Sequence, residues 1–155
     1  MFQRIQSLYL ILTMVLSVLF QSFDILQIID PSNQSINLNL REIFTKGVST
    51  YYGIHTELIS LLSVSALITT ISFIALLFFK RRVLQLKMTR ILIALEFCLM
   101  AASGYLVYIL LLNEGLKLNP VICSFIPILI LLFSFLAYRG IKKDEELVRS
   151  SDRLR

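Results

Sequence analysis

Glu96 is the one formally charged residue well inside a long apolar stretch of this sequence. An ionisable group in hydrocarbon is costly and usually faces protein or water. Ser103 lies seven residues further on and shares its helix face, so the two form a candidate intramembrane polar site. The functional interpretation is a proton or cation site. The alternative, which we favour, is a structural acid six residues beyond Arg90 that pairs with Arg4, Lys87 or a partner protein.

Hydroxyl and small side chains repeat at intervals of three and four residues along three of the apolar stretches. The stripes are Thr13, Ser17 and Gln21; Ser65, Thr69 and Ser72; and Ala94, Cys98 and Ala102. Such stripes could line a polar path, but they are more often contacts between membrane helices, where hydroxyls bond across the interface and small residues allow close approach. We therefore predict that they pack helices together.

The sequence lacks other residue patterns that are typical of catalytic, metal-binding or phosphate-binding sites. Cys98 and Cys123 are expected at different depths and belong to no C-x-x-C pair, and His55 stands alone, so we expect no metal site. No glycine-rich phosphate loop or nucleophile motif occurs. The sequence therefore predicts no cofactor and no enzymatic activity.

The composition excludes an ordinary soluble domain. Hydrophobic residues make up 57% of the 155 residues and charged residues only 16%, against about 25% in a typical soluble domain. The mean hydropathy is +0.80. The net charge of +5 sits in short clusters between uncharged stretches, which is typical of membrane topology signals and not of a nucleic-acid-binding face. We expect the chain to contact a lipid bilayer and no nucleic acid.

Four apolar stretches are long enough to cross a hydrocarbon core, which takes about 20 helical residues. They cover about residues 5–23, 58–79, 91–112 and 118–138. The sequence predicts an all-α membrane protein, in which residues 1–155 form a single antiparallel bundle of four transmembrane helices. Pro127 lies inside the fourth stretch and is expected to kink it.

The distribution of basic residues predicts the orientation. Twelve Lys and Arg residues lie in the N-terminus, the 80–90 connection and the tail 139–155, and three lie in the other two connections. Positive charge concentrates on the cytoplasmic side of membrane proteins. We therefore expect both termini in the cytoplasm and residues 24–57 outside. Within this outer loop, residues 23–29 and 35–40 flank the turn sequence D-P-S-N and predict a small β-hairpin.

The tail combines both signs of charge with leucines. Leu147 and Leu154 are seven residues apart, and Lys142 can pair with Glu146 one helical turn later. A tail that merely attracted anionic lipid would gain nothing from three consecutive acids, so we expect it to dock on a partner or on the chain's own cytoplasmic face. The candidate docking residues are Arg4, Lys142, Asp144, Glu145, Leu147, Arg149 and Arg153.

The two ends of the sequence carry a family resemblance. The start M-F-Q-R-I-Q-S-L-Y-L and the end A-Y-R-G-I-K-K-D-E-E-L-V-R-S-S-D-R-L-R resemble an uncharacterised family of small bacterial four-helix membrane proteins, a domain of unknown function. The resemblance implies a Gram-negative inner membrane but no activity. We therefore expect a structural or accessory subunit of a larger inner-membrane assembly, bound to another membrane protein or to further copies of itself. The alternative is a small transporter or channel that uses Glu96.

Overall fold

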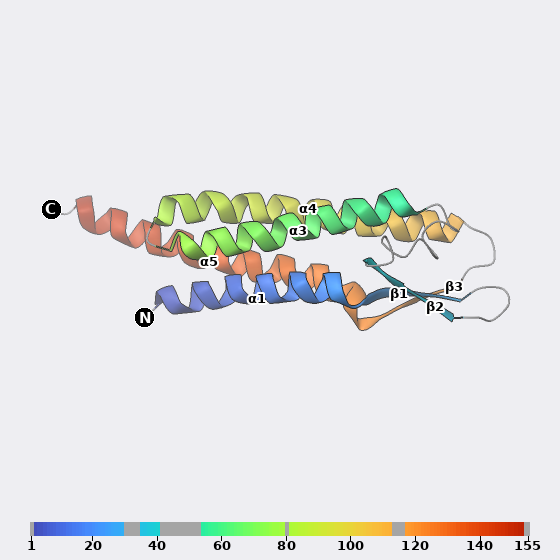
Figure 1. Cartoon of the computed structure of the whole chain (residues 1–155). Helices are drawn as coiled ribbons and strands as arrows, with labels where there is room; N and C mark the ends of the chain where they lie inside the picture. The colour runs from blue at the N-terminus through green and yellow to red at the C-terminus, as the bar shows by residue number, and fades with distance from the viewer. Residues whose placement is uncertain (1, 30–34, 41–53, 80, 113–116, 154–155) are drawn as a thin grey trace.

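The computed structural model describes residues 2–29, 35–40, 54–79, 81–112 and 117–153 (Figure 1). Four long helices run along the molecule: α1 (Phe2–Ser22), α3 (His55–Leu77), α4 (Arg82–Leu112) and α5 (Ile126–Arg153). Strands β1 (Asp24–Ile29), β2 (Ser35–Asn39) and β3 (Lys117–Pro120) form a small sheet, and the 3-10 helix η2 (Ile122–Phe125) leads into α5.

The four helices form a ring in which each runs antiparallel to its neighbours. α1 packs against α3 and α5, and α4 packs against the same two helices. The ends of the chain lie at one end of this ring, called here the terminal end, and the sheet lies at the other, called the sheet end (Figure 1). The antiparallel four-helix arrangement predicted from the apolar stretches is thereby confirmed.

Each helix is long and apolar enough to cross a membrane. Mean hydropathy in the candidate spans is 1.6 to 2.2, yet only 22–33% of each span is buried inside the protein. Many apolar side chains therefore lie on the outer surface of the described part of the bundle. Helices satisfy every backbone hydrogen bond within the segment, which is what a chain in hydrocarbon requires.

The buried positions repeat with alternating steps of three and four residues, as in a left-handed coiled coil. On α4 they include Leu92, Glu96, Leu99 and Leu106, and on α3 they include Leu58, Leu61, Ser65, Ile68, Ser72 and Ala75. Each long helix has at least one buried polar residue among the described residues: three in α1, two in α3, three in α4 and Ser134 in α5. The interior of the bundle is therefore a leucine and isoleucine core interrupted by polar contacts.

The sheet has three strands in the order β2-β1-β3, one more than the predicted hairpin. The expected pairing of β1 with β2 is present, with Ile28 opposite Ile36, while the turn sequence at 30–33 lies outside the described residues. β3 pairs with the other edge of β1, with Ile28 opposite Leu118. The connection after α4 therefore contains a strand at residues 117–120.

Two predicted helix boundaries are wrong. The last helix begins at Ile126 and not at residue 118, because residues 117–120 pair with β1. Pro127 consequently occupies the first turn of α5, where a missing N–H costs nothing, so it does not kink the helix interior.

α4 begins at Arg82, nine residues before the predicted start at residue 91. The segment up to Arg90 is charged on one side, but Gln85, Leu86 and Thr89 are buried against the bundle. This amphipathic pattern continues the helix beyond the apolar stretch. Likewise α5 continues without a break through the predicted tail to Arg153.

Candidate functional site

Glu96 lies in the interior of the bundle, where its side chain is 1% exposed. Its Oε1 atom accepts a hydrogen bond from the hydroxyl of Ser134 on α5. The Ser134 Oγ lies 3.5 Å from Oγ1 of Thr13 on α1, and Thr13 donates to the carbonyl of Tyr9 at 2.9 Å. One carboxyl group and two hydroxyl groups thus bring α4, α5 and α1 together in the interior of the bundle.

The second oxygen of Glu96, Oε2, is buried and has no hydrogen-bond partner among the described residues. The predicted partner Ser103 does not contribute, since its hydroxyl bonds the carbonyl of Met100 on its own helix at 2.9 Å. The expected ion pair with Lys87 is also absent, because Lys87 is exposed and Glu96 is enclosed. The Arg4 side chain lies outside the described residues.

Ser134 is the residue that the sequence reasoning missed. It occupies a buried position of α5, four residues after Ile130 and three before Ala137, which are buried as well. That spacing was visible in the sequence, but only the placement of α5 against α4 shows that this hydroxyl meets Glu96. A buried carboxyl group with only one hydrogen-bonded oxygen can hold or release a proton. Among the described residues, no cluster of acidic, histidine or cysteine side chains is suited to a metal ion.

A second polar cluster joins α1 to α3 nearer the sheet end. The Ser17 hydroxyl donates to the Ser65 carbonyl at 3.0 Å and shares a hydrogen bond with Thr69 Oγ1 at 2.8 Å. The amide of Gln21 donates to the same Thr69 oxygen at 3.0 Å. These stripes therefore pack helices against each other, as predicted.

The third stripe lies mostly outside the bundle interior. Ala94 and Cys98 are exposed on the outer surface of α4, and only Ala102 is partly buried against the core. The predicted helix contact is therefore not found inside the bundle at Ala94 and Cys98, because the buried face of α4 is set by the Leu92, Glu96 and Leu99 positions.

At the terminal end, α5 crosses close to α1. The Gln6 amide donates to Oδ2 of Asp144 at 2.6 Å. Gly140 permits this approach, since a Cβ at that position would lie 2.9 Å from Cγ of Gln6. One of the predicted docking residues, Asp144, therefore already binds the chain's own first helix.

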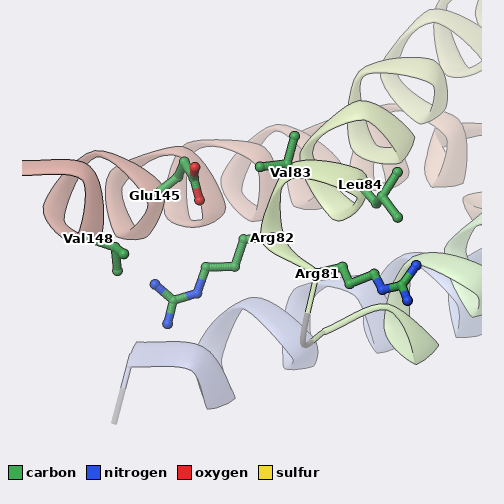
Figure 2. A pocket seen from close by; sticks show the side chains of 6 residues that line it. All are labelled: Arg81, Arg82, Val83, Leu84, Glu145 and Val148. Carbon is green, nitrogen blue, oxygen red and sulfur yellow. The ribbon is translucent and has the colours of Figure 1, made fainter. Parts of the chain in front are cut away.

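The extension of α5 also forms a hollow of about 630 Å³ with the start of α4, called here the terminal hollow. It is lined by Arg81, Arg82, Val83, Leu84, Glu145 and Val148 (Figure 2). The Arg82 guanidinium reaches toward α5, where it donates to the Asp144 carbonyl at 3.4 Å, and Arg81 points the other way (Figure 2). The hollow thus presents both signs of charge beside apolar side chains.

The other predicted docking residues follow the same helix. Lys142 forms the expected ion pair with Glu146 at 3.8 Å, and both side chains are largely exposed. Leu147 is 58% exposed. Arg149 and Arg153 lie in α5, but their side chains, like that of Arg4 in α1 and the whole of Leu154, are outside the described residues.

The bundle has four helices that are long and apolar enough to span a bilayer, with a buried carboxyl between them, and it is compatible with a multi-pass membrane protein. The chain belongs to the family described as a domain of unknown function, DUF4293, whose model matches residues 2–154. The family resemblance carried by the two ends of the sequence is thereby confirmed. No curated protein and no solved structure matches the chain.

Proposed function

We propose that this protein is a structural or accessory subunit of a larger assembly in a bacterial inner membrane, with no catalytic activity of its own. Both termini lie in the cytoplasm in this proposal, so the terminal end is the cytoplasmic end. Support comes from the four apolar helices and from the twelve basic residues that the sequence places at this end.

The observation that carries the proposal is the terminal hollow. α5 does not stop where its apolar stretch ends but continues as a helix to Arg153, and its Glu145 and Val148 form one wall of the hollow. Exposed Val83 and Val148 lie among the charged residues Arg81, Arg82 and Glu145 there. A surface that combines apolar anchors with a charged rim is typical of a protein interface.

The test is to truncate the chain after Asp144. This change removes the α5 wall of the hollow but keeps the Gln6–Asp144 hydrogen bond, so the bundle should still fold. The protein would be purified in a mild detergent from its native membranes, and co-purifying proteins would be compared with those of the full chain. We expect the truncated chain to insert normally and to lose its partner.

The matched control is Arg139→Ala, which removes an exposed charge from α5 six residues before Glu145 and outside the hollow. This variant should keep the partner. If the truncated chain inserts and retains every protein that the full chain binds, the accessory proposal is wrong.

Glu96 favours a second candidate function, a small proton transporter or channel. Its Oε2 atom is buried without a hydrogen-bond partner among the described residues, and membrane-embedded carboxyls often belong to proton pathways. The purified protein in sealed vesicles would be assayed with a pH-sensitive dye inside. Proton flux that is lost in Glu96→Gln, with folding intact, would favour the transporter over the accessory subunit.

A further inference from the structure

We propose that a groove between α4 and α5 binds an anionic phospholipid, with an acyl chain in the groove and the headgroup phosphate on Arg90. This inference rests on the proposed insertion of the bundle in a membrane. It concerns the lipid-facing side of the two helices and not the terminal hollow.

The groove has a volume of about 350 Å³ and no polar lining. Ile93 and Phe97 form its α4 side, and five residues between Ile128 and Leu136 form its α5 side. Phe97 is 59% exposed and Phe135 is 55% exposed, so the groove opens to the surroundings of the bundle. Its α5 side runs from Ile128 to Leu136, which is about 12 Å of helix. This shape suits a segment of a flexible hydrocarbon chain.

A cation lies at the terminal end of the groove. Arg90 is one turn before Ile93 on α4, and its guanidinium carbon lies 5.8 Å from the centroid of the Tyr138 ring, two residues beyond Leu136 on α5. The exposed Lys87 lies one further turn toward the terminal end. Among the described residues no carboxylate pairs with Arg90, so its donors are available to an anion.

The chemistry at this cation favours a phosphate of the bilayer. Arginine binds phosphate oxygens with paired, charge-assisted hydrogen bonds. Basic sites between membrane helices on the cytoplasmic side bind anionic headgroups. Arg90 is three and seven residues before Ile93 and Phe97 and so shares their face of α4, which lets one molecule with an anionic head and an apolar tail contact both Arg90 and the groove.

A second copy of the chain fits this surface less well. Close helix packing in membranes prefers small side chains, whereas two phenylalanines and several leucines and isoleucines form these walls. A copy at the same depth would also bring no acid to Arg90, because Glu96 is enclosed and Asp144 lies about 9 Å beyond Tyr138 along α5.

The chain contains no tryptophan, which allows a direct optical test. Phe135→Trp places a single reporter in the groove, called here the groove reporter. Phe73→Trp places a matched reporter, called here the α3 reporter, at a position that is 53% exposed on a helix packed against α1 and α4. Each variant would be reconstituted in phosphatidylcholine vesicles that contain an equal fraction of either brominated phosphatidylglycerol or brominated phosphatidylcholine, whose bromines quench tryptophan.

We expect brominated phosphatidylglycerol to quench the groove reporter with an apparent affinity about three- to tenfold above that of brominated phosphatidylcholine. The two lipids should quench the α3 reporter equally. Adding Arg90→Gln should remove the preference at the groove reporter, while Arg81→Gln, at an exposed arginine away from the groove, should leave it unchanged.

Four outcomes overturn the proposal. Equal quenching of the groove reporter by both lipids shows that no anionic lipid is selected. A preference that survives Arg90→Gln shows that Arg90 does not bind the headgroup. Weak quenching of the groove reporter together with cross-linked dimers shows that a second copy covers the groove. If neither lipid quenches the α3 reporter, the bundle is not in the bilayer, and the proposed membrane function fails as well.

Discussion

Ser134 of α5 donates a hydrogen bond to Glu96 of α4, and both side chains are almost completely enclosed. The contact joins residues 38 positions apart in the sequence and extends through Thr13 to α1. A carboxyl group without a partner would be costly in this interior. We infer that the Ser134 hydroxyl compensates part of that cost and thereby fixes α4 against α5.

Removing the Ser134 hydroxyl should therefore destabilise the bundle more than neutralising the acid. Ser134→Ala leaves Glu96 with no bond to either oxygen and should cost about 1–3 kcal/mol of unfolding free energy. Glu96→Gln keeps an acceptor for Ser134 and should change stability by less than about 1 kcal/mol. Unfolding titrations with SDS in mixed micelles would measure both. A loss in Glu96→Gln as large as that in Ser134→Ala would contradict this account.

The Ser17–Thr69 hydrogen bond at 2.8 Å should couple α1 to α3 energetically. In a double-mutant cycle of Ser17→Ala and Thr69→Val, we expect a coupling of roughly 0.6 kcal/mol and at most about 1.7 kcal/mol. The control is Ser63→Ala, whose exposed hydroxyl bonds only its own helix at Ser60. Additive effects of the two substitutions would show that the hydrogen bond contributes no net stability.

The sequence predicted the bundle because its signals are local. A long run of apolar residues indicates a helix with apolar surroundings. Spacings of three and four residues, as in Ser65, Thr69 and Ser72, indicate which residues share one helix face. The β1–β2 hairpin was equally predictable, because its two strands flank a short turn sequence.

The features that the sequence did not predict depend on pairs of distant segments. β3 is a four-residue strand that exists by pairing with β1, about 90 residues earlier. The partner of Glu96 is set by which helix lies opposite, so Ser134 could not be distinguished from Ser103 by periodicity. The early start of α4 was missed because a helix can begin before its apolar stretch begins.

Gly140 should tolerate one carbon atom but not a branched side chain. In Gly140→Ala the added Cβ meets Cγ of Gln6 at 2.9 Å, yet alanine favours a helix by about 1 kcal/mol over glycine, so the two effects should nearly offset. Gly140→Leu should separate α1 from α5 and cost about 1–3 kcal/mol or more. The same unfolding titration applies. Equal stability of the leucine and alanine variants would show that the two helices are not in close contact here.

The third strand can be tested by an engineered disulfide. Gln27 of β1 lies opposite Asn119 of β3. In a background with Cys98→Ala and Cys123→Ala, the pair Gln27→Cys and Asn119→Cys should form a disulfide on mild oxidation, detected as a mobility shift that a reductant reverses. The control pair Asp24→Cys and Asn119→Cys is out of register and should react far less. Equal yields from both pairs would argue against the β1–β3 pairing.

The proposal that four helices cross a membrane with both ends of the chain inside the cell is tested most directly by cysteine accessibility. Single cysteines would replace Thr56, exposed at the sheet end, and Lys143, exposed on α5 at the terminal end, in the cysteine-free background. Intact cells would be treated with a membrane-impermeant maleimide before and after permeabilisation. We expect the cysteine at 56 to react in intact cells and the one at 143 to react only after permeabilisation. Labelling at 143 in intact cells, with 56 protected or equally reactive, would contradict the proposed topology.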